Sequence, residues 1–368
     1  MALDIPLWEQ QELEATSPEG EDGPRDAGPF PLERPSIQEA LADYADLKAK
    51  SCLPLIVGRD WKSRSDLDED WLLPYVIKRS NVGNRSSDHF HWATRMACDS
   101  AVSPSPIRSW YDRKIRQSVE NSIYYADSPR SALAMRKYIP PQFRPSAAKA
   151  LYELLNARRI YDPCGGWGDR MAGAMAYGAD HYHSRDVNPM VFAGYELQRL
   201  HLPTTTDVTF EYRGAEVDPP TGPWFDVAFT SPPYYKIEKY QGEQQSFRRY
   251  KGCDAWLDGF MYPMVTNTWA SLVDGGYMLI NISDCYVDHR QNVLCRPMVE
   301  YCLTVLEDCR LVGTIGYEIG VRTGRRIKSG VGAEPVFIFQ KGGSEEFADL
   351  LPQTELLFEP HRPSEDND

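Results

Sequence analysis

The sequence predicts an α/β fold, in which a mostly parallel sheet has helices on both faces. From about residue 146 onward, short apolar runs alternate with longer amphipathic stretches, and this alternation is typical of such sheets. The length of 368 residues and the hydrophobic content of 42% allow an ample core. No apolar run reaches the length of a membrane span, and the start MALDIPLWEQ does not resemble a secretion signal. We therefore expect a nuclear or cytoplasmic protein that is neither secreted nor inserted in a membrane.

The expected elements follow one another in regular order along this part of the chain. Ser146 is expected to cap a helix over 147–156, because it follows a proline and precedes an apolar stretch. Strands are expected at 159–162, 181–186, 208–212, 226–229, 277–282, 311–320 and 335–340. The helices between them are expected at 170–178, 189–200, 254–273 and 296–308.

The negative charge of the chain is concentrated at its two ends. The net charge is −13, and residues 1–34 and 344–368 each carry −7, so residues 35–343 are left at about +1. Acids, Gly and Pro dominate these ends, which predicts disordered acidic tails at 1–35 and 344–368. The near-neutral body can therefore hold a basic cleft for nucleic acid, although the whole chain is acidic.

Residues 36–145 form a mixed segment without clear strand alternation. Helices are expected within 37–50 and 111–126. Aromatic side chains and histidines are interleaved with Arg and Lys in this segment, for example Trp61, His91 and Trp110. Such a composition suits stacking on bases and contact with phosphates, and it fits an ordinary charged surface equally well. We expect an accessory region that contributes to substrate binding.

A glycine-rich turn connects the first strand to the next helix, in the sequence Asp162-Pro-Cys-Gly-Gly-Trp-Gly. Gly165, Gly166 and Gly168 allow the backbone to turn sharply and to approach a ligand closely. The turn is not a P-loop, because no Gly-Lys-Ser/Thr follows. A dinucleotide fingerprint would need glycine where Met171 stands.

Two further positions at strand ends point to a nucleoside-containing ligand. Asp186 ends the second strand, where a carboxylate can accept hydrogen bonds from both hydroxyls of a ribose. Gly214, Ala215 and Glu216 follow the third strand, where an adenine could lie. Together with the glycine-rich turn, these positions favour such a ligand over ordinary turns with helix-capping acids.

The fourth strand ends in Thr-Ser-Pro-Pro-Tyr-Tyr at residues 230–235. Two consecutive prolines stop the strand and stiffen the chain that follows it. The tyrosines then stand just past the carboxyl end of the strand, where open α/β sheets bind their ligands. The corner is therefore either a stiff loop or a recognition device.

This combination resembles the S-adenosylmethionine-dependent amino-methyltransferases that modify exocyclic amines of nucleic-acid bases. The resemblance covers about residues 140–340: residues 162–168 match the family's cofactor loop, Asp186 its ribose acid, and Ser231-Pro-Pro-Tyr234 its catalytic motif. Cys164 and Trp167 depart from the family's usual aromatic and small residues, which would alter the pocket wall. The resemblance implies a Rossmann-like class I methyltransferase domain at 146–343, with a seven-stranded sheet whose last strand is antiparallel.

The resemblance and the neighbouring sequence give three sets of candidate site residues. For S-adenosylmethionine, the candidates are Asp162, Cys164, Gly165, Gly166, Gly168, Asp186, Asn188 and Ala215, with Phe143 and Arg144 from a further cofactor-contacting motif. The candidate catalytic residues are Ser231, Pro232, Pro233 and Tyr234. For substrate, aromatic and basic residues in the loops after the motif and at 322–330 are candidates, and mobile surface loops are the alternative: Tyr235, Tyr240, Arg248, Arg249, Tyr250, Arg325 and Arg326.

The motif has a chemical rationale for an amine substrate. An exocyclic amine is a poor nucleophile, because its lone pair is delocalised into the ring. If Ser231 and the Pro232 carbonyl accept its two N–H bonds, the nitrogen can pyramidalise and its developing positive charge is stabilised. Tyr234 would stack on a base that has left its nucleic-acid context.

We expect methyl transfer to adenine N6 in RNA, including an adenosine near the 5′ end of mRNA. Three alternatives remain: modification of DNA at cytosine N4 or adenine N6, methylation of a protein glutamine, and a non-catalytic RNA-binding subunit. A cytosine-C5 enzyme is disfavoured, because that chemistry needs a cysteine after the fourth strand, where Ser231 stands. The eight cysteines show no paired spacing, so neither a metal site nor a disulfide framework is expected.

Overall fold

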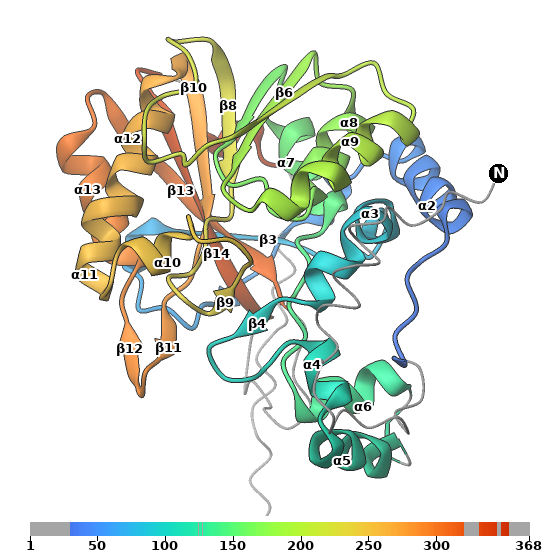
Figure 1. Cartoon of the computed structure of the whole chain (residues 1–368). Coiled ribbons are helices and arrows are strands. Elements are labelled where there is room, and N and C mark those ends of the chain that lie inside the picture. Colours follow the sequence, from blue (N-terminus) through green and yellow to red (C-terminus); the bar gives the residue numbers. More distant parts are fainter. Residues whose placement is uncertain (1–29, 124, 127, 320–330, 344–346, 353–368) are drawn as a thin grey trace, which may run out of the picture.

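The computed structural model describes residues 30–352 except 124, 127, 320–330 and 344–346 (Figure 1). A ten-stranded sheet forms its centre. The seven main strands are β5 (Arg159–Asp162), β6 (His181–Asp186), β7 (Asp207–Tyr212), β8 (Phe225–Thr230), β10 (Leu272–Asn281), β13 (Cys309–Glu318) and β14 (Val331–Lys341).

The order of these strands is β7-β6-β5-β8-β10-β14-β13. The pairs from β7 to β10 are all parallel, whereas β14 runs antiparallel to both β10 and β13. The expected α/β fold, with a mostly parallel sheet and an antiparallel last strand, is thereby confirmed. The order reverses between β5 and β8, and such a reversal opens a crevice at the carboxyl ends of the strands.

Three short strands from the N-terminal part of the chain extend this sheet, and they were not expected. β3 (Leu72–Ile77) lies parallel to β13, and β1 (Ile56–Gly58) lies antiparallel to β3 at the edge. β2 (Trp61–Lys62) pairs with the start of β14. The sheet therefore crosses the domain boundary that the sequence suggests at residue 145.

Helices cover both faces of the sheet (Figure 1). One face carries α7 (Pro145–Leu154), α8 (Asp169–Tyr177) and α9 (Phe192–His201), and the other carries α11 (Cys253–Trp256), α12 (Tyr262–Ala270) and α13 (Cys295–Val305). Neighbouring residues of β5 show the alternation, because Ile160 packs in the first hydrophobic core and Tyr161 in the second. The core is thus divided into two layers by the sheet.

The helix expected at 254–273 has an interruption. α11 passes through a π-helical turn at Leu257–Met261 into α12, which ends at Ala270 before β10 begins. Gly259 lies in this turn, and a Cβ there would stand 2.2 Å from the ring of Tyr250. A glycine at this position therefore lets the loop before α11 pack against the helix.

A group of helices with its own core, residues 84–137, projects from the sheet; we call it the helical lobe (Figure 1). It contains α3 (Asn84–Met96), α4 (Pro106–Tyr111), α5 (Arg113–Ile123) and α6 (Pro129–Arg136). Trp92, Trp110 and Leu133 are buried in its core, together with Leu32 from the N-terminal segment.

Two expectations for the N-terminal part of the chain are corrected by this packing. Trp61, Trp92, Trp110 and His91 are buried, so their rings do not form the base-stacking surface that the composition suggested. Leu32 packs in the lobe, so the expected disordered tail does not extend over residues 30–35. Residues 1–29 lie outside the described part of the chain.

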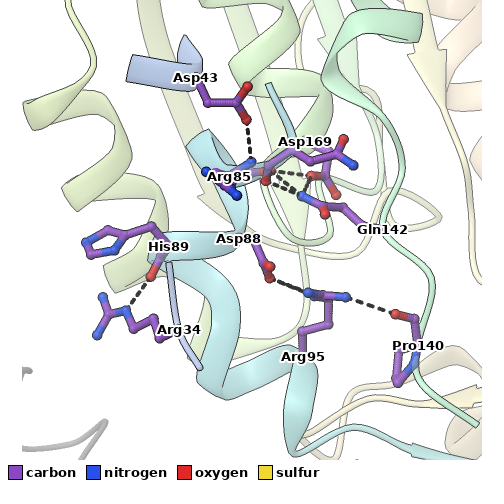
Figure 2. Close-up of polar contacts among 11 residues, drawn as sticks. Arg34, Asp43, Arg85, Asp88, His89, Arg95, Pro140, Gln142 and Asp169 are labelled. Carbon is purple, nitrogen blue, oxygen red and sulfur yellow. Dashed lines mark hydrogen bonds and ion pairs between the residues drawn. The ribbon is translucent and has the colours of Figure 1, made fainter. Parts of the chain in front are cut away.

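Polar contacts join α3 to the rest of the molecule (Figure 2). Asp43 of α2 (Ile37–Ala49) accepts hydrogen bonds from the backbone N–H groups of Gly83 and Arg85 at 2.9 and 2.8 Å. It thereby caps the N-terminus of α3 from another helix. Asp169, the first residue of α8, accepts a hydrogen bond from Gln142 at 2.8 Å in the same region.

The lobe also contacts the loop that follows the Ser-Pro-Pro-Tyr motif. β4 (Asp99–Ser100) pairs antiparallel with β9 (Glu238–Lys239), and the Tyr138 hydroxyl donates a hydrogen bond to Glu238. Smaller elements complete the fold: α10 (Ser246–Arg249), the hairpin β11 (Cys285–Val287) and β12 (Arg290–Asn292), and α14 (Phe347–Leu350). The lobe is thus fixed to the part of the chain that the sequence assigns to catalysis.

Two local expectations were wrong. The helix assigned to 147–156 begins at Pro145, so Ser146 is inside it and donates to the Ser80 carbonyl at 3.4 Å, because proline suits the first position of a helix. Phe347 is buried against the body in α14, so this part of the expected acidic tail is folded. Among the helices of the described residues, none is long and apolar enough to cross a bilayer.

Candidate active site

A cleft opens where the strand order reverses, at the carboxyl ends of β5, β6, β7 and β8. Its wall includes eight of the predicted site residues: Cys164, Gly166, Asp186, Asn188, Ala215, Ser231, Pro233 and Tyr240. These residues come from four separate strand ends and one later loop. The structure therefore brings the glycine-rich turn, the second-strand acid and the proline corner into one cavity.

A buried ion pair between Asp162 and Arg170 supports the glycine-rich turn. Asp162 is 0% exposed, and its Oδ2 accepts hydrogen bonds from Arg170 Nε and from the Tyr182 hydroxyl, both at 2.7 Å. Arg170 also donates to the carbonyl of Cys164, and the backbone N–H of Cys164 donates to Asp162 Oδ1 at 3.2 Å. Asp162 does not line the cleft, so its contacts are those of a residue that shapes the loop.

The three glycines of the turn have different surroundings. A Cβ on Gly165 would lie 2.6 Å from the Tyr195 hydroxyl, and one on Gly168 would lie 2.2 Å from Gln198 Oε1, so both allow close packing of α9. Gly166 has a φ of +60°, its Cβ position is no closer than 3.9 Å to other atoms, and it lines the cleft. Of the three, Gly166 is therefore the one whose backbone is presented to a ligand.

Asp186 stands at the end of β6 with both oxygens engaged by backbone. Oδ2 accepts from the N–H of Gly166 at 2.8 Å, and Oδ1 accepts from the N–H of Asn188 at 2.7 Å. Burial raises the pKa of Asp186 to about 6, and these N–H donors oppose the shift. Each carboxylate oxygen keeps a second lone pair, so the fixed group can still accept hydrogen bonds from the cleft.

The segment after β7 forms the opposite wall of the cleft. Asn267 of α12 donates to the Ala215 carbonyl at 2.9 Å and holds this segment in place. Glu216 also lines the cleft, and its largely buried carboxylate forms an ion pair with Arg249. Arg249, which was predicted to bind substrate, is therefore paired with a carboxylate of the cleft wall.

The proline corner presents its residues in different directions. Ser231 and Pro233 line the cleft, whereas Pro232 is buried. The Tyr234 hydroxyl lies 3.1 Å from Glu334 Oε2 and 3.3 Å from Asn281 Oδ1, so its side chain reaches towards β14 and β10. Tyr235 has a φ of +56°, a left-handed conformation that is uncommon for a bulky residue and turns the chain sharply.

Phe143 and Arg144 lie behind the cleft and are absent from its wall among the described residues. The Phe143 ring stacks on Tyr317 at a centroid distance of 4.8 Å. Arg144 donates from Nε to the Tyr317 hydroxyl at 2.7 Å, and its guanidinium lies 3.9 Å from the Tyr317 ring centroid. Both residues therefore join the segment before α7 to β13.

The remaining substrate candidates fall into four groups. Tyr240 lines the cleft and packs edge-on against Trp167 at 5.6 Å. Tyr235 is 4% exposed and packs against Trp256, so its ring belongs to the core. Arg248 pairs with Glu243 at 3.2 Å, and Tyr250 accepts from Arg249 at 3.1 Å, both at the periphery. Arg325 and Arg326 lie outside the described residues.

Trp167 lines the cleft, as its place in the glycine-rich turn suggested. Several other residues of the cleft wall were missed by sequence reasoning: Pro163, Val187, Val191, Arg213, Gln244, Gln245, Ser246 and Phe260. Val187 and Arg213 adjoin predicted residues and could have been included on that ground. Nothing in the sequence indicated Phe260, because its position in the cleft depends on how the π-helical turn packs in the second core.

The cleft combines an apolar wall with a few polar groups at fixed positions. Val187, Ala215 and Phe260 offer apolar surface, while Asp186 and Ser231 offer acceptors. This combination is typical of sites for small organic ligands. In the described part of the chain, no group of three or more His, Cys, Asp or Glu side chains is arranged to hold a metal ion.

Comparisons with known proteins find solved structures of low similarity to this chain. No family model matches the chain, and no curated protein matches it. Solved structures that resemble it include TrmN from Thermus thermophilus, with 18% identity over 54% of this chain and 48% of that one, at a TM-score of 0.36. An rRNA methylase from Streptococcus thermophilus shares 12% identity over 55% of this chain and 99% of its own, at 0.31. A putative RNA methyltransferase from Pyrococcus horikoshii shares 12% over 54% and 82%, at 0.34.

Proposed function

We propose that this chain transfers a methyl group from S-adenosylmethionine to the exocyclic amine of a nucleic-acid base. The observation that carries the proposal is that Gly166, Asp186, Ala215 and Ser231 line one cleft. These residues belong to the cofactor loop, the ribose acid, the adenine position and the catalytic motif of the family that the sequence resembles.

The residues of the cleft fit S-adenosylmethionine. Asp186 would hold the ribose hydroxyls, because both of its oxygens are fixed by backbone N–H groups and keep free lone pairs. Val187 and Phe260 offer apolar surface that suits the adenine ring. The bound cofactor supplies an electrophilic methyl group, so the main tasks of the protein are to position the amine and to stabilise its charge.

Ser231 would act as an acceptor for the target amine at the edge of the cleft. The preceding strand β8 lies in the middle of the sheet, and Pro232 and Pro233 remove freedom from the chain that follows it. The left-handed turn at Tyr235 fixes the exit of this corner. A rigid corner of this kind suits catalysis by preorganised hydrogen-bond acceptors.

The charge of the helical lobe supports a nucleic-acid substrate. Residues 84–137 contain nine Lys and Arg against five acids, a net charge of +4 in a chain with −13. Arg113 and Lys114 at the start of α5 are exposed to solvent. Exposed basic side chains on a lobe of positive net charge suit contacts with phosphates. We favour adenine N6 in RNA, including adenosine near an mRNA 5′ end, as the first target to test.

The test is methyl transfer from labelled S-adenosylmethionine into matched pools of capped RNA, uncapped RNA, single-stranded DNA and duplex DNA. Digestion to nucleosides then identifies the modified base. We expect label in N6-methyladenosine from RNA. A Ser231→Ala variant should lose transfer and keep binding to S-adenosylhomocysteine, because Ser231 faces the amine and not the ribose.

Other outcomes would change the proposal in defined ways. If label appeared in cytosine or adenine of DNA, the proposed amine chemistry would stand and the proposed substrate would change from RNA to DNA. Label in a protein glutamine would replace the class of substrate. A chain that binds the cofactor but transfers no methyl group to any of these substrates would contradict the enzymatic proposal and favour a binding subunit.

A further inference from the structure

A chain of hydrogen-bonding groups leads from the cleft into the sheet. The Tyr234 hydroxyl lies 3.1 Å from Glu334 Oε2 and 3.3 Å from Asn281 Oδ1. Asn281 is itself held, because its amide donates to the Pro335 carbonyl at 3.0 Å. The amide can therefore accept but not easily turn, and Glu334 is the acidic partner of Tyr234.

The Tyr234 phenol also interacts with the side chain of Ser231. Burial raises the pKa of the Tyr234 phenol, the carboxylate of Glu334 raises it further, and a hydrogen bond with the Ser231 side chain lowers it. Ser231 lines the cleft. Ser231, Tyr234 and Glu334 thus form a connected series from the cleft wall to β14.

Within the part of the chain that the structure describes, Glu334 is a partly buried carboxylate with no close cation to compensate its charge. It lies on β14 directly opposite Tyr317 of β13, and it forms no ion pair within 4 Å among the described residues. The charged or titratable groups around it are Tyr138, Tyr234, Tyr317, Arg64, Arg144 and Glu238. A partly buried carboxylate without a close cation is costly for stability, which favours a functional reason for its presence.

The proposed reaction releases a proton that needs an acceptor. As the amine nitrogen takes the methyl group, the N–C bond forms with the nitrogen lone pair and the S–C bond electrons remain on sulfur, which becomes a neutral thioether. The nitrogen then carries a positive charge and must lose one proton to give the neutral methylamine. Ser231 has no carboxylate to take this proton, unlike an Asp at the same position of the motif.

We propose that Glu334 accepts this proton through Tyr234 and Ser231, and so supplies the carboxylate that the first position of the motif lacks. Ser231 takes the amine proton and passes its own hydroxyl proton to Tyr234. The Tyr234 hydroxyl in turn passes its proton to Glu334, and the neutral hydroxyls are restored. Glu334 does not touch the substrate and acts through Tyr234. This inference rests on the proposed function.

The relay predicts that the rate of methyl transfer falls at low pH. Burial raises the pKa of Glu334, whereas the hydrogen bond from Tyr234 and the charges of Arg64 and Arg144 lower it in part. Only the ionised carboxylate can accept a proton. The rate of transfer should therefore fall as the pH drops through this raised pKa, which forms the acid limb of the pH–rate profile.

The test compares pH profiles of single-turnover methyl transfer for four proteins: the full-length wild type, Glu334→Gln, Tyr234→Phe and the double variant. Glutamine keeps a hydrogen-bond acceptor at position 334, and phenylalanine keeps the ring at position 234. We expect each single variant to lose about 10²-fold in rate and to lose the acid limb. The double variant should be no slower than either single variant, because both changes break the same relay.

Glu238→Gln is the matched control. Glu238 is a second partly buried carboxyl near the corner, and burial raises its pKa to about 7, but its bond is to Tyr138 and not to Tyr234. The control should keep the acid limb. An acid limb that persists in Glu334→Gln, or that disappears in Glu238→Gln alone, would overturn the relay.

Cofactor binding separates this inference from the proposed function. Titration with S-adenosylhomocysteine should give the same affinity for the wild type and Glu334→Gln, because Glu334 does not line the cleft. A wild-type chain that methylates no base would overturn the proposed function and the relay with it. An active wild type whose rate and pH profile are unchanged by Glu334→Gln would overturn the relay alone.

Discussion

The cleft and the helical lobe differ in how their charged side chains are placed: those of the cleft have fixed partners, whereas those at the start of α5 are exposed. In the cleft region, Asp162 is paired with Arg170 beneath the loop, and both oxygens of Asp186 accept backbone N–H groups. On the lobe, Arg113 and Lys114 are exposed above an apolar core. Buried charges with fixed partners set the shape of a site, whereas exposed charges attract a partner of opposite sign without fixing its position. The two regions should therefore respond differently to mutation, pH and salt.

The largest effect is expected at the buried ion pair under the cleft. Arg170→Met removes the cation and leaves the carboxylate of Asp162 unpaired in a site with no exposure. We expect a loss of about 3–5 kcal/mol in the free energy of unfolding, measured by urea denaturation. Arg158→Met, at the exposed pair with Asp180, is the control and should leave the midpoint unchanged. Equal midpoints for the two variants would contradict the view that this pair holds the loop.

An intermediate effect is expected at the cleft acid. Asp186→Asn should weaken S-adenosylmethionine binding about 10- to 100-fold, because hydrogen bonds to a charged acceptor contribute about 1.5–3 kcal/mol. Calorimetric titration measures this loss. Asp207→Asn, an exposed carboxylate on the neighbouring strand β7, is the control and should bind as the wild type does.

The same acid predicts how binding depends on pH. Burial raises the pKa of Asp186 to about 6, and a protonated carboxyl loses acceptor strength. The affinity of the wild type should therefore fall as the pH drops below about 6, and it should be level well above that value. The Asn variant should show no such fall. A wild-type affinity that stays constant from neutral to acidic pH would show that Asp186 does not hold the ribose.

The smallest effect is expected on the helical lobe. Arg113→Ala with Lys114→Ala should weaken RNA binding a few-fold and leave stability unchanged, since both side chains are exposed. The slope of log affinity against log salt should decrease by about 0.7 for each phosphate contact that is lost with a single strand. Arg199→Ala, an exposed arginine on α9, is the control. An unchanged slope would remove the lobe from the nucleic-acid interface.

The part of the fold that carries the cleft could be predicted because its signals are local. Each of β5, β6 and β8 is a short strand that ends in a distinctive turn, and parallel strands place their carboxyl ends at one edge of the sheet. The sequence could therefore predict that Cys164, Asp186 and Ser231 lie close together. Their meeting in one cleft follows from strand order alone.

The helical lobe could not be predicted in the same way. Its aromatic residues are interleaved with Arg and Lys, a composition that suits a stacking surface, yet Trp92 and Trp110 are buried. Composition does not say which side of a helix faces the core when several short helices pack together, because that depends on neighbours distant in the chain. Leu32, for example, fills the lobe from outside its sequence range.

The sequence by itself determined the order of strands and helices from residue 146 onward, the two turns and the second-strand acid, because these depend on periodicity and on residues adjacent in the chain. Only the tertiary structure decided which of those residues face the cleft. It placed Asp162 under the loop in an ion pair with Arg170, although the sequence assigned it to the ligand. It also placed Glu334 beside Tyr234, 100 residues away in the chain. Side-chain contacts between distant segments are set by the packing of the whole sheet, and no local pattern records them.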